Sequence, residues 1–318
     1  MTLRKRLGAA LASLFAMSSL CAPGQAAPLV GSRALPSRVV ANLYRLGSHS
    51  DSVFLVTTPE GHFLINSGSS DASDAEVRPQ TLRAQMEALG FRLGDVKVLL
   101  TNHAHADHVG GHAQIRRLTG ARVVVMEGDE EAVRTGVSSD YGIAVRWALP
   151  CPVDEIIHDG GHVELGGVKL TAYRTAGHTR GATTWSLHLE DGGRQLDVLL
   201  LDSTMRYPGR ELFESDYPDR LRDYAESVRA LKGLPADVLF DPHGGEWRGG
   251  PAILRFLRSR EEALMREAQV QLRRRMDPVE WEKARERSRR EFRAWLADPA
   301  TRAAFPEMQV VSGIDPSN

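Results

Sequence analysis

Three imidazoles and one carboxylate fall within six consecutive positions, His103-Ala104-His105-Ala106-Asp107-His108. Neutral imidazole and carboxylate are good zinc ligands, and a local cluster lowers the loop-closure cost of building a metal site. Residues two apart in an extended chain point the same way, so His103 and His105 can reach one ion. Asp107 and His108 then turn toward a neighbouring ion. The run follows the apolar segment 96–101, which is typical of a buried strand, and this predicts a metal site at a strand end.

Two more histidines follow predicted strands and stand next to glycine. His178 comes after a strand that ends near Arg174, and His243 comes directly after the predicted strand Val238–Phe240. Either histidine alone would suit a structural role. Together with the cluster, both become candidate ligands, whereas the other histidines have no comparable setting (His49, His62, His112, His158, His162 and His188).

The remaining pattern predicts strands in groups with helices between them. Strands are expected over 53–57, 63–65, 121–126, both sides of Gly166-Gly167, and 198–201. Helices are expected over 81–89, briefly from Val109, over 219–232, and after Gly250. This periodicity supports an α/β or α+β fold, two packed sheets included, and does not decide among such folds.

The amino-acid composition is that of a folded protein with a large core, and it does not favour binding to nucleic acid. The chain has 318 residues, 42% of them hydrophobic, and a formal net charge of −1. A chain of this kind can build a large core, and its charge gives no field that would favour nucleic acid. We expect no nucleic-acid partner.

The first residues resemble a secretory signal. Arg4, Lys5 and Arg6 precede an uncharged apolar run over 7–20, and Gly24-Gln25-Ala26 supplies small residues for cleavage after Ala26. The run is shorter than the roughly 20 residues of a spanning helix. We therefore expect a signal peptide over 1–26, a periplasmic or secreted protein, and no membrane attachment after cleavage. Cys151 would then stand without a partner cysteine, as a buried inert thiol.

Three motifs resemble the metallo-β-lactamase superfamily, in the same order along the chain: HAHADH at 103–108, GHTRGATTW at 177–185 and PHGG at 242–245. The segments 55–68, 163–170 and 223–243 are similar to subclass B3 of the metallo-β-lactamases. The resemblance implies an α/β fold, an αββα sandwich with metals at the edge of the two sheets. It also implies two Zn²⁺ per chain, the first held by His103, His105 and His178 and the second by Asp107, His108 and His243.

The activity that this resemblance implies is hydrolysis of the β-lactam amide bond in penicillins, cephalosporins and carbapenems by a zinc-held hydroxide. Asp107 would orient this hydroxide besides ligating. Asp202-Ser203 is open to two interpretations, because glyoxalase-type relatives use such an aspartate to bridge both metals. In the B3 interpretation, which we favour, Ser203 lies near the second metal and holds water or the substrate carboxylate. Met205 departs from B3 enzymes, which commonly have a polar residue there.

Two other functions stay open. A lactonase or a glyoxalase-type thioesterase would use the same fold and the same pair of zinc ions. A zinc-binding protein without activity is disfavoured, because three ligands per metal leave open positions, as catalytic sites do. The expected partner is a small-molecule substrate, with no obligate protein partner evident. The expected organisation is one hydrolase domain over 27–318 with a C-terminal helical segment over about 251–300.

Overall fold

A computed structural model describes residues 35–48, 51–69, 79–139, 144–202, 217 and 219–275, then positions 279, 282–283, 286–287, 290, 293–294, 297–299 and 309–310. The expected signal peptide, Ser203 and Met205 lie outside the described residues. No helix in the described ranges has both the length and the apolar character needed to cross a membrane.

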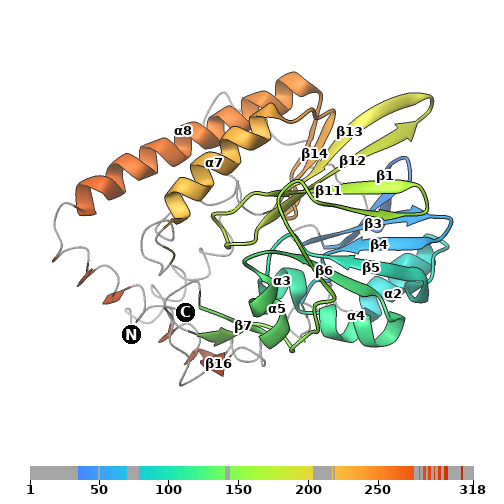
Figure 1. Cartoon of the computed structure of the whole chain (residues 1–318), viewed down its shortest axis with the longest axis horizontal. Coiled ribbons are helices and arrows are strands. Elements are labelled where there is room, and N and C mark those ends of the chain that lie inside the picture. The colour runs from blue at the N-terminus through green and yellow to red at the C-terminus, as the bar shows by residue number, and fades with distance from the viewer. Residues whose placement is uncertain are drawn as a thin grey trace, which may run out of the picture.

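Two sheets form the centre of the molecule (Figure 1). The first has the order β1-β2-β3-β4-β5-β6-β9, with bounds β1 Ser37–Val40, β2 Leu43–Gly47, β3 Ser52–Thr58, β4 Gly61–Ile65, β5 Val96–Leu100, β6 Arg122–Met126 and β9 Glu155–Ile157. The second has the order β10-β11-β12-β13-β14-β15, with bounds β10 His162–Leu165, β11 Val168–Arg174, β12 Thr183–Asp191, β13 Arg194–Leu200, β14 Val238–Phe240 and β15 Glu246–Arg248. A small third sheet joins β7 Val137–Ser138, β8 Val145–Arg146 and β16 Gln309–Val310.

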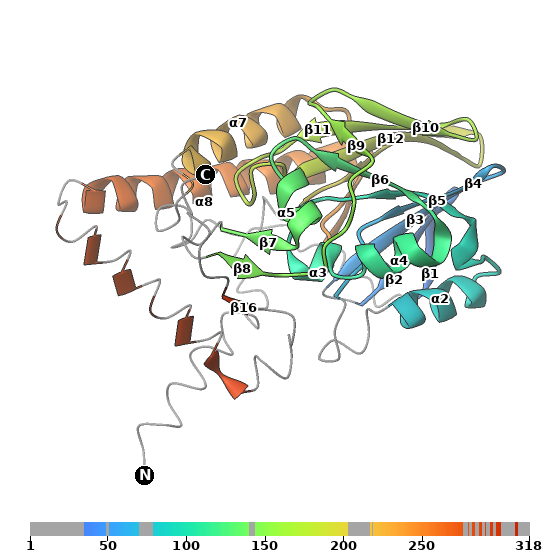
Figure 2. The ribbon, with the colours of Figure 1, turned by 60° about the horizontal axis from the view of Figure 1, so that its bottom comes forward.

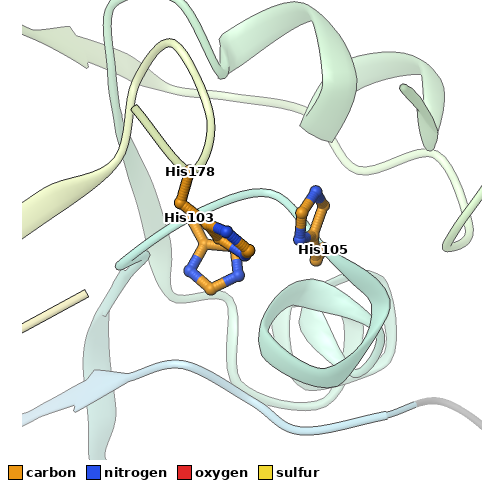
Figure 3. A group of neighbouring side chains, drawn as sticks. All are labelled: His103, His105 and His178. Carbon is orange, nitrogen blue, oxygen red and sulfur yellow. The ribbon is translucent and has the colours of Figure 1, made fainter. Parts of the chain in front are cut away.

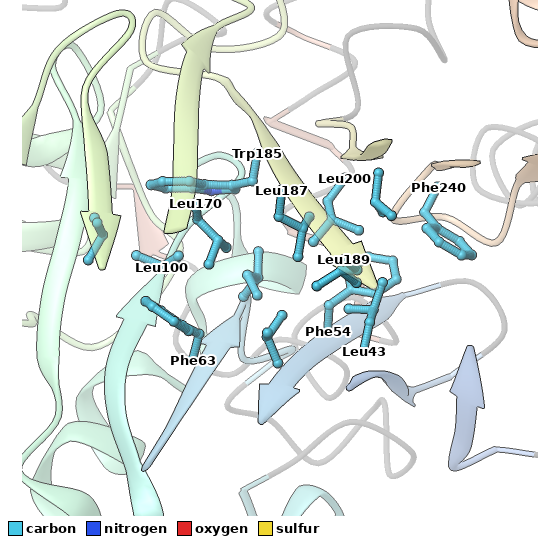
Figure 4. Packing of buried hydrophobic residues seen from close by; sticks show 14 of the residues in the cluster. Leu43, Phe54, Phe63, Leu100, Leu170, Trp185, Leu187, Leu189, Leu200 and Phe240 are labelled. Carbon is cyan, nitrogen blue, oxygen red and sulfur yellow. The ribbon is translucent and has the colours of Figure 1, made fainter. Parts of the chain in front are cut away.

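The main core lies between the two large sheets (Figure 4). Phe54 of β3 and Leu100 of β5 contribute to it from the first sheet, and Trp185 of β12 and Phe240 of β14 from the second. Successive strand residues point to opposite faces, so Leu55 packs on the outer side instead. Both faces of these strands are buried, which explains their continuous apolar sequence.

Helices cover both outer faces (Figures 1 and 2). On the first sheet they are α2 Pro79–Ala88, α4 His112–Thr119 and α5 Glu130–Thr135; on the second they are α7 Arg220–Gly233 and α8 Gly250–Arg275. Leu82 and Ile115 belong to the cluster beneath the first group, and Val228 and Ile253 to the cluster beneath the second. The layers therefore run helix, sheet, sheet, helix, as the αββα prediction requires.

The segment after the histidine cluster differs from the prediction. In place of one helix from Val109, the structure has α3 Ala106–Val109 and then α4, which begins at His112. Gly111 separates them in close contact with another segment, since a Cβ there would lie 2.7 Å from the Ser67 carbonyl oxygen. The cluster therefore includes a helical turn, which carries Asp107 and His108.

Cys151 is buried, as the sequence predicts. Burial raises the pKa of its thiol to about 11. The reactive thiolate is therefore scarce at neutral pH.

Candidate metal centre

The candidate ligands lie on loops that leave strands at one edge of the sandwich. β4, β5 and β6 run parallel to one another in the first sheet. In the second sheet, β11 and β13 both run antiparallel to β12, and β13 runs parallel to β14. The carboxyl ends of β11, β13 and β14 therefore share one edge. His178 follows β11 and His243 follows β14, while the histidine cluster follows β5 from the other sheet.

His103, His105 and His178 form one compact group, as predicted (Figure 3). One ligand atom from each lies within 4.8 Å of the others. Their ring centroids are 4.8 Å (His103–His105), 4.5 Å (His103–His178) and 4.7 Å (His105–His178) apart. All three side chains are buried. Two loops from different sheets thus converge on a point that one ion could occupy.

The charge state of this group suits a metal. Burial, reinforced by the neighbouring imidazoles, holds the pKa of His103 and of His178 well below the ordinary value. Both rings are therefore neutral at neutral pH and can offer a nitrogen lone pair. Neither ring nitrogen of His103 has a hydrogen-bond partner among the described residues, although the ring is 1% exposed. A buried polar atom without a hydrogen-bond partner lowers the stability of the fold. Three imidazoles are a set of ligands that zinc prefers.

The second predicted set surrounds Asp107 but is less compact. Asp107 groups with His103 and His108, and separately with His243 and Asp51. Asp107 Oδ2 lies 3.3 Å from His108 Nε2 and 3.8 Å from His243 Nε2. Burial by itself raises the pKa of the Asp107 carboxyl, but His108 and His243 outweigh it and hold that pKa well below its usual range. The predicted ligands thus meet at an anionic carboxylate, with Asp51 as a member that the sequence did not suggest.

Asp129 joins the two ligand loops. Its Oδ2 accepts hydrogen bonds from Ala104 N at 2.9 Å and from Thr179 Oγ1 at 2.7 Å. Its Oδ1 accepts one from Gly181 N at 2.8 Å. In the sequence Asp129 resembles an ordinary helix N-cap before α5, yet its side chain makes no capping bond. The carboxylate instead fixes the loop of His103 and His105 against that of His178.

Two buried asparagines form hydrogen bonds between the strand ends next to the candidate metal site. Asn66 Nδ2 donates to Asn102 Oδ1 at 2.8 Å, and Asn102 N donates to Asn66 Oδ1 at 3.0 Å. Asn102 Nδ2 reaches across to the Thr183 carbonyl at 2.9 Å. This chain of bonds ties the ends of β4 and β5 to the start of β12. His103 therefore follows a residue that both sheets hold in place.

His112 has a structural setting, in agreement with its exclusion from the predicted ligands. Its Nδ1 lies 2.6 Å from Ser67 Oγ and its Nε2 lies 2.8 Å from Thr101 Oγ1. Burial is the main reason that its pKa falls to about 3, with a smaller contribution from His108. The ring is thus a neutral bridge behind the ligand loop.

Asp202 lies two residues after the end of β13 and is fully buried. Within the described residues, none of the groups that could hold a metal includes it. Both interpretations of Asp202 therefore stay open.

Residues 47–243 match the family model of the metallo-β-lactamase superfamily, which is more than half of the chain. The chain belongs to this superfamily. Solved structures similar to it include subclass B3 metallo-β-lactamases. FEZ-1 metallo-β-lactamase from Legionella gormanii is 30% identical with a TM-score of 0.67, and the match covers 74% of this chain and 96% of that one. BJP-1, a subclass B3 metallo-β-lactamase of Bradyrhizobium japonicum, is 25% identical with a TM-score of 0.66. That match covers 74% of this chain and 94% of BJP-1.

Curated relatives found by sequence carry another name. Hydroxyacylglutathione hydrolase from Cereibacter sphaeroides is 32% identical over 154 residues, which is 48% of this chain and 50% of that protein. The hydroxyacylglutathione hydrolase from Methylococcus capsulatus is 30% identical over 173 residues, which is 54% of this chain and 56% of that protein. The chain thus spans about half the length of these relatives. The chain is thus similar to named hydrolases of two kinds, β-lactamases among the solved structures and hydroxyacylglutathione hydrolases among the curated relatives.

Proposed function

We propose that this chain hydrolyses the β-lactam amide bond of penicillins, cephalosporins and carbapenems with two zinc ions. The observation that carries the proposal is the extent of the structural match, which reaches 96% of FEZ-1 and 94% of BJP-1. The similarity to hydroxyacylglutathione hydrolases stops at about half of those proteins. The structural match therefore covers nearly the whole of both lactamases, whereas the sequence match covers about half of each hydroxyacylglutathione hydrolase.

The proposed ligands divide between the two ions as the sequence predicts. His103, His105 and His178 would hold the first ion, and Asp107, His108 and His243 the second. Bound zinc supplies a nucleophile at neutral pH by lowering the pKa of water, and it polarises the carbonyl group under attack. All the residues of the first set are buried, so they fix the reacting centre and exclude bulk water from one side of it.

Asp107, a proposed ligand of the second ion, has the most exposed side chain of the six ligands. Its side chain is 37% exposed, whereas that of His108 is 1% exposed. The ionised carboxylate can accept a hydrogen bond from the attacking water and so hold it against the carbonyl carbon. Cleavage of the C–N bond then needs one proton on the departing nitrogen, which the attacking water supplies.

Hydrolysis of a glutathione thioester is the second candidate, favoured by the curated relatives. The two candidates differ at Asp202, because the glyoxalase-type interpretation requires this carboxylate to bridge both metals.

A substrate comparison tests the proposal. The zinc-loaded chain is assayed with a chromogenic cephalosporin, a carbapenem, an acyl-homoserine lactone and S-lactoylglutathione, before and after chelation. We expect the β-lactams to be opened, activity to be lost with chelator, and activity to return with zinc. Rapid turnover of the thioester or lactone with no β-lactam hydrolysis would replace the proposed function by the second candidate or by a lactonase.

Export to the periplasm is also part of the proposal, and it rests on the signal-like pattern in residues 1–26. N-terminal sequencing of the protein from a periplasmic extract should begin at Ala27. An uncleaved chain confined to the cytoplasm would contradict the proposal that the protein is exported.

A further inference from the structure

We propose that Asp51 is a positioning residue for His243: its carboxylate accepts the Nδ1 proton of this imidazole and thereby turns the Nε2 lone pair toward the second metal. The inference rests on the proposed metal centre and extends it by a residue outside the predicted ligand sets.

The two nitrogens of the His243 ring face two different carboxylates. Nδ1 lies 3.3 Å from Asp51 Oδ1, and Nε2 lies 3.8 Å from Asp107 Oδ2. Asp107 also belongs to the group with His103 and His108, so Nε2 faces the metal-binding side. Asp51 lies on the Nδ1 side of the ring, and Nδ1 must carry a proton if Nε2 is to bind a metal; a carboxylate oxygen of Asp51 also lies within 4.8 Å of one of Asp107.

Burial makes this contact effective. The side chains of His243 and Asp51 are 9% and 16% exposed. Little water is available to compete for the Nδ1 proton, and a charged acceptor gives the stronger kind of hydrogen bond. An imidazole that ligates zinc commonly donates its other N–H to a carboxylate, which fixes the tautomer and raises the basicity of the ligating nitrogen.

The backbone holds Asp51 in a tight hairpin between β2 and β3. Ser48 N donates to the Asp51 carbonyl at 3.0 Å, and Asp51 N donates to Ser48 Oγ at 3.0 Å. Gly47 has φ +84°, and a Cβ there would lie 2.3 Å from the Asp51 carbonyl oxygen. Any other residue at position 47 would therefore push the hairpin apart.

The same hairpin is bonded to the loop that carries His243. Ser52 N donates to the Pro242 carbonyl at 2.5 Å, one residue away from both members of the pair. His243 N donates to Asp241 Oδ1 at 2.8 Å, which fixes the other loop internally. The Asp51–His243 contact thus joins two segments that the backbone already places side by side.

The test compares Asp51→Ala and Asp51→Asn with the unmodified full chain. Each protein is stripped of metal and titrated with Co²⁺ against a competing chelator, with visible absorption reporting each equivalent. Exchangeable imidazole N–H signals, shifted by the paramagnetic ion, are recorded by ¹H NMR. Asp197→Asn is the matched control, because it also removes a carboxylate facing a histidine Nδ1, that of the exposed His188 at 2.5 Å. Urea unfolding confirms that each variant folds.

We expect Asp51→Ala to weaken the second cobalt equivalent by about 10- to 100-fold, to leave the first unchanged, and to remove one shifted N–H signal. Asp51→Asn should recover part of the affinity, since its amide oxygen can still accept the proton. The control should match the unmodified chain. If Asp51→Ala fails to fold, Asp51→Asn alone decides the matter through its smaller loss of affinity and its displaced N–H signal.

Three results would overturn the inference. The first is an unchanged second equivalent with every N–H signal in place. The second is complete loss of one cobalt in both variants, which would make Asp51 a ligand. The third is a single cobalt in the unmodified chain, which would leave His243 no second ion to bind. None of these readouts uses a β-lactam, so a chain that binds two cobalt ions and opens no β-lactam would refute the proposed function and leave Asp51 in its role.

Discussion

Replacement of Asp129 by asparagine should loosen the first metal group without touching any ligand. The carboxylate accepts two donors at Oδ2, Ala104 N and Thr179 Oγ1, and one at Oδ1, Gly181 N. Asparagine keeps one oxygen, which can take the place of Oδ2. Its NH₂ group then faces the N–H of Gly181, and two donors cannot bond to each other. The loop of His178 therefore loses its tie to the loop of His103.

The expected loss in free energy of unfolding follows from the number of hydrogen bonds that each substitution removes. One hydrogen bond to a charged acceptor contributes about 1.5–3 kcal/mol, so Asp129→Asn should lower the free energy of unfolding by about that amount. Asp129→Ala leaves three buried donors without an acceptor and should cost about 3–5 kcal/mol. Thr179→Val is the matched control: it removes one donor but leaves no buried donor unpaired, since the carboxylate keeps two others, and it should therefore cost less, about 1 kcal/mol.

Urea unfolding of the metal-free proteins measures these differences, and zinc titration against a chelator measures the first site. We expect affinity for the first zinc to fall about tenfold or more in Asp129→Asn and to change little in Thr179→Val. An Asp129→Asn protein with the stability and zinc affinity of the unmodified chain would refute the argument that Asp129 holds the two loops together.

Three further predictions concern the same edge of the sandwich. His178→Ala should remove the first zinc and nearly abolish turnover, whereas His243→Ala should lower the zinc content from about two to about one per chain by atomic emission; unchanged content would exclude the second site. Asp107→Asn should lose much more zinc than Asp202→Asn, and equal losses would favour the glyoxalase-type site. The metal-free chain should lose stability as pH falls below about 6.5, because the unfolded state takes up protons that the native His112, with a pKa of about 3, refuses. Urea unfolding should show His112→Asn reducing this pH slope by about 1.4 kcal/mol per pH unit, and an unchanged slope would contradict it.

Much of the fold could be predicted from local sequence. Strand periodicity and glycine positions indicated β3, β5, the β10–β11 hairpin and α7, because burial on one or both faces leaves a direct record in residue type. The arrangement as two sheets came from the resemblance alone, since apolar runs do not say which strand pairs with which. The division into α3 and α4 was missed because it depends on the contact of Gly111 with Ser67, which is 44 positions away in the chain.

Only some residues of the candidate site could be predicted from the sequence. The histidines were found because three of them cluster locally and the other two follow apolar strands. Asp129 was missed because its sequence context is that of a helix cap, whereas its donors lie 25 to 52 positions away. Asp51 was missed because it stands in a short turn, and only the pairing of that turn with the loop after β14 gives it a neighbour. Long-range partners of single carboxylates leave no local pattern to read.

A crystal structure of the zinc-loaded chain, with anomalous data collected on both sides of the zinc absorption edge, would show how many zinc ions the chain binds and which residues hold them. We expect two anomalous peaks about 3.5–4 Å apart. One should lie about 2.0–2.1 Å from nitrogens of His103, His105 and His178, and the other among Asp107, His108 and His243. A single peak, or two peaks bridged by the carboxylate of Asp202, would contradict this expectation.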